Sequence, residues 1–206
     1  MKIFAVVRNY GSSSVESPFG MGEPVWYEVP DSSLLRSGQP FFVPDFAGEF
    51  RAFPTVVHRI SRLGKGIAAR FASRYIDAVT IGCCAVAVDM LRELRRDGRP
   101  WSRAVAFDRC CMIGKFLPCE GTPSLWQASC GGREISYDLS EVLHGVPEML
   151  ERLSRDITVK EGDMMMTALH PVGLPLMVGT KLAICRNVNG MGENESFNKV
   201  LDINIR

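Results

Sequence analysis

The segment FPTVVHRISRLGK at residues 53–65 decides the fold, because its β-branched centre predicts a strand over about residues 55–63. Successive side chains of a strand point to opposite faces of its sheet. Phe53 and Thr55 therefore share one face, and His58 points to the other. This alternation determines which side chains of the segment can meet in one site.

Further strands are predicted on both sides of this segment. They cover residues 2–7, short pieces of the proline-rich stretch 24–46, the apolar run VTIGCCAVAVDM at 79–90, a hairpin over 124–139 that turns at Gly131-Gly132, and the stretches 163–169, 180–188 and 199–205. The chain is therefore expected to be a single α+β domain over residues 1–206, mainly β with a few short helices.

Three helical segments are expected between the strands. The first, residues 66–77, places Ile67, Phe71 and Tyr75 four apart, as on one face of an amphipathic helix. The second covers 90–98 and ends at Gly98. The third covers 138–156, and Pro147 is expected to split it into two pieces.

Composition excludes several function classes. The 206 residues carry a formal net charge of +1 with dispersed Lys and Arg, which gives no electrostatic case for nucleic acid or anionic lipid. The apolar runs are too short for a signal peptide or a membrane span. The seven cysteines lack any CxxC spacing, which favours reduced, mostly buried thiols in a cytoplasmic protein. Cys83–Cys84 and Cys110–Cys111 each place one sulfur on each face of a strand.

Eight fragments, in this order, resemble the fumarylacetoacetate hydrolase family. They are VVRNY at 6–10, PDSSLLRSGQPFFVPDF at 30–46, RISRLGK at 59–65, DMLREL at 89–94, GRPW at 98–101, AFD at 106–108, IGKFLP at 113–118 and EGDMMMT at 161–167. Each fragment alone is weak, but their order and spacing match the family's catalytic domain over nearly the whole chain.

The resemblance implies a mixed β-roll with short helices, usually assembled as a homodimer. It also implies an enzyme that binds Mg²⁺ or Mn²⁺ through carboxylates, with the metal chelating a 2-oxo acid or 1,3-dicarbonyl substrate and stabilising an enolate-like intermediate. Family members hydrolyse acylpyruvates, decarboxylate oxaloacetate or isomerise unsaturated dicarboxylates.

The family holds its metal with a Glu-x-Glu pair on one strand and an Asp on a later strand. The resemblance carries the two Glu onto Phe53 and Thr55, and the Asp onto Asp89. Neither Phe nor Thr is an anionic ligand, and no Glu or Asp lies between Arg51 and Asp77. Asp89 is therefore the only metal-ligand candidate. One carboxylate alone binds Mg²⁺ weakly. No cofactor is expected, unless an active enzyme uses Mg²⁺ or Mn²⁺ here.

Other family positions are substituted as well. A general-base His corresponds to Ser13, two Lys correspond to Val29 and Val105, and the second Thr of a TGTP loop corresponds to Leu169. Arg92 is retained. The losses coincide with positions that bear charge or hydrogen bonds in the family's site, whereas the scaffold fragments are intact.

Asp89 and His170 complete a vestigial pocket with Phe53 and Thr55. We interpret Asp89 as a buried carboxylate paired with Arg92 or another arginine, with a remnant metal ligand as the alternative. His170 is interpreted as a surface loop histidine. Its alternative is a new site, for zinc, made with Asp89 and a nearby thiol.

The sequence therefore favours a family member that has lost metal-dependent catalysis, and that either binds a small molecule in an apolar pocket or serves as a structural subunit. The alternative is an active hydrolase, decarboxylase or isomerase that acts on 2-oxo acids such as acylpyruvates or oxaloacetate, using Asp89, Arg92 and substituted ligands. A third hypothesis is a scaffold protein without a ligand. The expected partner is a second copy of the chain, with neither nucleic acid nor membrane.

Overall fold

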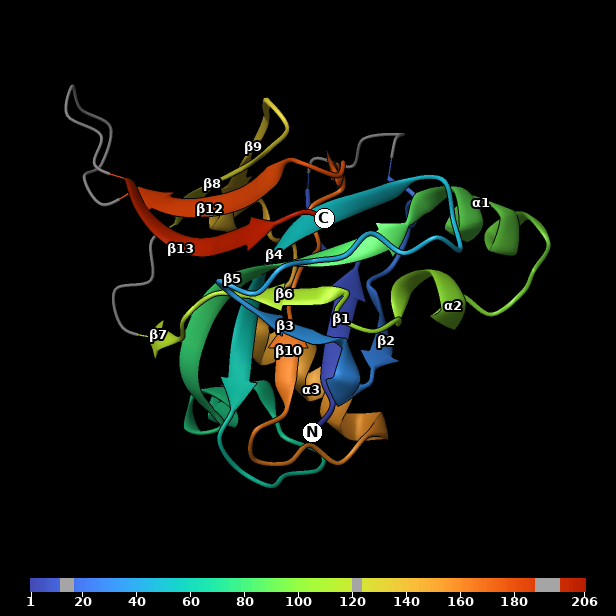
Figure 1. Cartoon of the computed structure of the whole chain (residues 1–206). Helices are drawn as coiled ribbons and strands as arrows, with labels where there is room; N and C mark the ends of the chain where they lie inside the picture. The colour runs from blue at the N-terminus through green and yellow to red at the C-terminus, as the bar shows by residue number, and fades with distance from the viewer. Residues whose placement is uncertain (12–16, 120–123, 188–196) are drawn as a thin grey trace.

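Two β-sheets make up most of the chain in the computed structural model, which describes residues 1–11, 17–119, 124–187 and 197–206 (Figure 1). The larger sheet has the strand order β2-β1-β10-β4-β5-β6-β3, with β11 paired to β4 and β7 paired to β5. Its strands are β1 (Ile3–Val7), β2 (Val25–Val29), β3 (Leu34–Arg36), β4 (Phe50–Ile60), β5 (Ile76–Ala87), β6 (Cys111–Ile113), β7 (Leu117–Pro118), β10 (Met164–Met166) and β11 (Leu174–Pro175). The smaller sheet has the order β13-β12-β8-β9. Its strands are β8 (Leu125–Cys130), β9 (Arg133–Asp138), β12 (Lys181–Asn187) and β13 (Phe197–Asn204). The predicted mainly-β α+β class is confirmed.

Both faces of the larger sheet are buried, which explains why β1 is apolar at every position. Phe4 and Val6 point to the face covered by helix α3 (Val146–Asp156), where they pack with Leu150. Ile3, Ala5 and Val7 point to the other face, into the main core that the smaller sheet completes. A strand covered on both sides needs no polar alternation.

The central pair of the larger sheet is β4 and β5, which run antiparallel along nearly their whole lengths. The strand predicted over 55–63 is present, but it begins at Phe50 and ends at Ile60. The strand predicted over 79–90 is also present, but it ends at Ala87. Helix α1 (Val88–Arg96) follows it directly, and the short helix α2 (Ser102–Val105) comes next.

Two helix predictions need correction. Residues Ala69–Arg74 form a 3₁₀ helix rather than an amphipathic α-helix. Phe71 is exposed, and its ring contacts the guanidinium groups of Arg70 and Arg74 rather than side chains of the core. Pro147 lies in the first turn of α3 and does not split a helix, since that turn needs no amide hydrogen there.

The hairpin prediction is confirmed, because β8 and β9 are joined at Gly131 and Gly132, both with positive φ (58° and 78°). In the described part of the chain, no helix has the length and apolarity that crossing a membrane requires.

Candidate functional site

Phe53 and Thr55 lie on the inner face of β4, and both are fully buried. The Phe53 ring packs edge-on against Phe19, with 5.8 Å between the ring centroids. A Cβ atom at Gly173 would lie 2.7 Å from Cζ of Phe53, so this ring needs a glycine beside it. The aromatic ring therefore fills the space next to β4 where a cation would have to sit.

Cys84 is the β5 residue that pairs with Phe53 of β4. The register of β4 and β5 pairs Phe53 with Cys84 and Thr55 with Gly82. Paired residues of adjacent strands point to the same face, so Cys84 lies on the same face of the sheet as Phe53 and Thr55. Asp89 lies five residues further along, in α1. A small cleft nearby is lined by Phe53 together with Val88 and Arg92, which flank Asp89 in α1, and the vestigial pocket that includes Asp89 stays a prediction.

Backbone amides hold the Asp89 carboxylate. Its Oδ2 accepts a hydrogen bond from the Gly48 amide at 2.7 Å, and its Oδ1 accepts one from the Met90 amide at 2.8 Å. Partial burial opposes ionisation, but these hydrogen bonds outweigh it and lower the pKa of Asp89. The predicted pairing with Arg92 is wrong, because the Arg92 guanidinium lies 3.1 Å from the carboxylate of Glu49.

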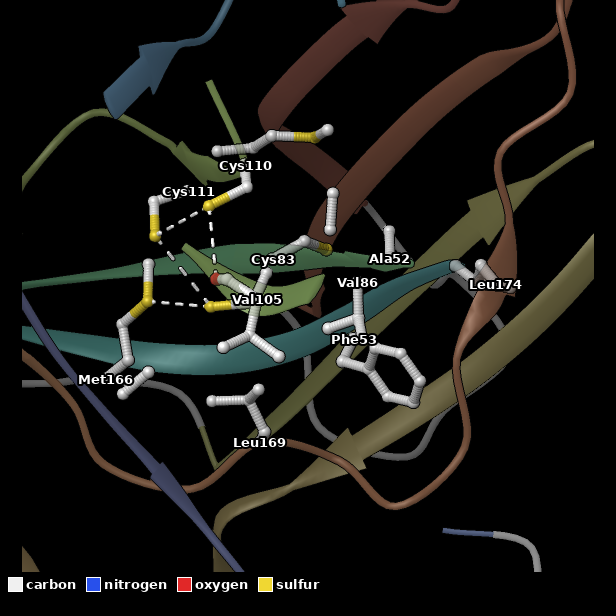
Figure 2. Packing of buried hydrophobic residues seen from close by; sticks show 14 of the residues in the cluster. Ala52, Phe53, Cys83, Val86, Val105, Cys110, Cys111, Met166, Leu169 and Leu174 are labelled. Atoms are coloured by element: carbon white, nitrogen blue, oxygen red, sulfur yellow. Dashed lines mark hydrogen bonds between the residues drawn. The ribbon is translucent and has the colours of Figure 1, made fainter. Parts of the chain in front are cut away.

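The substituted lysine and threonine positions are all in the core. Val29, Val105 and Leu169 are buried and belong to the same apolar cluster as Phe53. Figure 2 shows Val105 and Leu169 on the same side of Phe53 in this view, toward Met166. Apolar side chains thus close the region where the family places charge. Ser13 lies outside the described residues.

His170 is buried against two tyrosine rings and is not a surface histidine. Its ring centroid lies 4.8 Å from that of Tyr10 and 6.3 Å from that of Tyr137. Its Nδ1 accepts a hydrogen bond from the Val172 amide at 3.1 Å. Burial lowers the pKa of His170. These contacts come from β9 and from neighbouring loops. Within the described residues, His170 belongs to no group of three or more His, Cys, Asp or Glu side chains that could hold a metal ion.

His58 lies on the opposite face of β4 from Phe53, as strand alternation predicts. Its Nδ1 lies 2.8 Å from Oγ1 of Thr167. Burial lowers the pKa of His58 to about 4.

A group of sulfur atoms occupies the inner face next to Phe53, and sequence reasoning missed it. The thiol of Cys84 donates to Sδ of Met166 at 3.1 Å, and its Sγ lies 4.0 Å from Sγ of Cys111. Cys110 adds a further sulfur 4.0 Å from that of Cys111 (Figure 2). Hydrogen bonds with Cys110 and Cys84, together with burial, raise the pKa of Cys111. The adjacent pairs Cys83–Cys84 and Cys110–Cys111 were the only hint of this group in the sequence. Which sulfur atoms meet depends on the register of the strands, which the sequence does not give.

An open cleft lies beside this apolar region. It has a volume of about 440 Å³ and is lined by residues of β2, of α2 and of the segments just before and after α2: Tyr27, Glu28, Gly98, Arg99, Pro100, Trp101, Ser102, Val105 and Ala106. The Val105 side chain therefore separates the filled interior from this cleft.

Divalent cations such as Mg²⁺ and Mn²⁺ require several oxygen ligands, with carboxylates supplying charge. Among the residues that the structure describes, no group of three or more His, Cys, Asp or Glu side chains is placed to hold a metal ion. At the paired positions of β4 and β5 stand a phenyl ring, a threonine and a thiol. The residues present do not fit a hard divalent cation.

The chain belongs to the fumarylacetoacetate hydrolase family, because residues 2–168 match the family model described as "Fumarylacetoacetate (FAA) hydrolase C-terminal". The predicted family membership is therefore confirmed. Among curated relatives, an oxaloacetate tautomerase of Escherichia coli (strain K12) is 27% identical over 197 residues, covering 89% of this chain and 87% of the relative. The mitochondrial oxaloacetate tautomerase of Homo sapiens is 25% identical over 190 residues, covering 86% of this chain and 80% of the relative.

A similar solved structure is the fumarylpyruvate hydrolase of Pseudomonas aeruginosa, crystallised with Mn²⁺ and pyruvate. Its TM-score to this chain is 0.84 at 19% identity, covering 100% of this chain and 89% of that one. At this identity the likeness establishes the fold.

Proposed function

We propose that this family member has lost the divalent-metal chemistry of its relatives and has kept the fold as a binding or structural protein. One observation carries the proposal: Phe53 and Thr55 stand fully buried on β4 at the positions of the family's two Glu ligands, and the Phe53 ring fills the space beside them. Placing Mg²⁺ or Mn²⁺ there without anionic oxygens leaves the desolvation of the ion uncompensated.

A small-molecule role is supported by the cleft of about 440 Å³ beside Val105. This volume falls within the range of roughly 300–1,000 Å³ that ligand pockets occupy. Trp101, Val105 and Ala106 give the cleft apolar walls, whereas Glu28 and Arg99 lie at its polar part. A ligand bound here would contact Tyr27 and Val105, and no metal would be needed to hold it.

A second candidate is an active enzyme acting on a 2-oxo acid. The names of the relatives favour it, since both curated relatives are oxaloacetate tautomerases. Such an enzyme would have to polarise its substrate with groups other than a cation between β4 and β5. Asp89 and Arg92, near the start of α1, are its remaining charged candidates.

Titration with Mn²⁺, followed by calorimetry and by the electron paramagnetic resonance signal of the free ion, tests the proposal. We expect no stoichiometric binding by this chain, and binding by the E. coli relative measured beside it. Turnover of oxaloacetate and an acylpyruvate, with Mn²⁺ and with a chelator, separates the two candidates. Tight Mn²⁺ binding, or turnover that Asp89→Ala abolishes in a folded protein, would overturn the loss of catalysis.

A further inference from the structure

Three sulfur atoms from three different strands meet on the inner face of the larger sheet. They belong to Cys84 of β5, Cys111 of β6 and Met166 of β10, and all three side chains are fully buried. The Cys84 sulfur is the common neighbour, 3.1 Å from Met166 Sδ and 4.0 Å from Cys111 Sγ. A metal–thiolate bond is about 2.3 Å, so one ion can contact both cysteine sulfurs at their present separation.

The backbone fixes this convergence. Cys84 and Cys111 are direct partners in the antiparallel pairing of β5 and β6. The Ala85 amide donates to the Cys110 carbonyl at 2.7 Å, which makes the neighbouring pair hydrogen-bonded and leaves Cys84–Cys111 a non-hydrogen-bonded pair. Side chains of such pairs approach each other most closely. The two thiols are therefore held together by strand register rather than by a choice of rotamers.

The Tyr27 hydroxyl provides an independent observation. It is buried, and within the described part of the chain no acceptor forms a well-aligned hydrogen bond with it. Burial raises the pKa of Tyr27, and the Cys84 thiol beside its hydroxyl raises it further. A neutral thiol is a weak acceptor, so this buried O–H donor is poorly satisfied by Cys84. A charged thiolate at Cys84 would be a good acceptor for this donor, as it is when a metal ion binds a cysteine.

We propose that Cys84, Cys111 and Met166 form a binding site for a soft monovalent cation, Cu(I). Thiolate and thioether ligands select Cu(I), whereas Mg²⁺ and Mn²⁺ prefer carboxylate and carbonyl oxygens. Binding forms two copper–thiolate bonds and one copper–thioether contact, releases the two thiol protons to solvent, and changes no oxidation state. Zn²⁺ fits less well because it takes four ligands, and the described residues contain no group of three or more His, Cys, Asp or Glu side chains that could hold a metal ion.

This site goes beyond the proposed function, because a chain without catalysis need not bind copper. The replacement of hard ligands by soft ones on the same face of the sheet would convert the family's oxygen-ligand site into one of opposite metal preference. Cys110 lies 4.0 Å from Cys111, but its thiol donates to the Val105 carbonyl at 3.4 Å, and it is not needed as a ligand.

The test uses the full chain with the more accessible thiols Cys119 and Cys185 changed to Ser, so that they cannot bind copper. The reduced protein is given Cu(I) without oxygen, both when folded and during refolding, in competition with a colorimetric Cu(I) chelator. We expect one copper per chain and an ultraviolet thiolate-to-copper charge-transfer band. Cys84→Ser should abolish stoichiometric binding. Tyr27→Phe should weaken it on the order of ten-fold, as expected for a group that hydrogen-bonds a ligand.

Cys83→Ser is the matched control, since Cys83 is equally buried in β5 but points to the other face. It should bind copper like the parent. Met166→Leu keeps the packing volume and removes the thioether, so it tests the site even if Cys84→Ser fails to fold. The proposal fails if the parent takes up no copper, if Cys83→Ser loses as much affinity as Cys84→Ser, or if folded Tyr27→Phe and Met166→Leu both bind unchanged. Mn²⁺ titration of the same samples reports on the proposed function separately.

Discussion

At the scale of single residues, the substitutions on β4 and β5 are consistent with one another. A carboxylate at residue 53 would be buried and unpaired without a cation, which is costly, whereas Phe53 packs against Phe19 and over Gly173. The sequence could predict the loss at Phe53 and Thr55, because strand alternation fixes their face. It could not predict which side chains Cys84 contacts, because the pairing of β5 with its neighbouring strands depends on where β5 ends and α1 begins.

Protonation of His58 makes stability depend on pH. Burial lowers its pKa from 6.5 to about 4, so between these values the unfolded chain binds more protons than the folded one. Stability is therefore complete above pH 6.5, falls as the pH drops toward 4, and loses up to roughly 3 kcal/mol from this group. Urea unfolding across this range should show the slope, and His58→Gln should flatten it. Equal slopes for both proteins would contradict the assignment.

At the scale of elements, the strands and the helix α1 could be predicted from the sequence, whereas the helix expected over 66–77 is a 3₁₀ helix. Runs such as 2–7 and 76–87 are apolar enough to indicate strands covered on both faces, and Gly131-Gly132 indicates the turn between β8 and β9. The spacing of Ile67, Phe71 and Tyr75 predicted one face of a helix. The Phe71 ring instead lies at the surface, where the guanidinium groups of Arg70 and Arg74 contact it. Such a local contact cannot be inferred from apolar periodicity.

Asn9, in the VVRNY fragment, joins three elements. Its Nδ2 donates to the Thr167 carbonyl after β10 at 2.8 Å and to the His144 carbonyl before α3 at 2.9 Å, and its Oδ1 accepts from the His144 amide at 2.9 Å. Asn9→Ala removes all three bonds and leaves buried backbone groups unsatisfied, so we expect a loss of about 3 kcal/mol or more. The exposed Asn198→Ala in β13 serves as the control. Equal unfolding midpoints in urea for the two variants would contradict this role.

At the scale of the whole molecule, the backbone fold is retained whereas the side chains at the site differ from those of the family. The backbone follows a metal-containing hydrolase structure with a TM-score of 0.84, yet the inner face of β4 and β5 carries apolar and sulfur-bearing side chains. A fold of this kind is stabilised by its two cores, which do not depend on a bound ion. Fold and chemistry can therefore separate.

The assembly is the last expectation to test, and one apolar surface supports it. Phe42, Met177 and Val178 are each at least half exposed. Backbone hydrogen bonds place them around one segment: Phe41 and Val43 bond with Asn204 and Arg206, whereas Gly179 donates to the Ile205 carbonyl. Large side chains gathered in this way indicate a contact with another protein surface.

We predict that this surface contributes to a homodimer. Light scattering coupled to size exclusion should give twice the chain mass of 22.8 kDa for the natural protein. The double variant Phe42→Asp, Val178→Asp should give a monomer, because charged side chains at the contact would be desolvated without partners. Its circular dichroism should be unchanged, since both side chains point to solvent. An exposed leucine elsewhere, Leu63→Asp, is the matched control and should leave the dimer intact. A natural protein that remains a monomer at every concentration, or a double variant that still dimerises, would contradict the assignment of this surface.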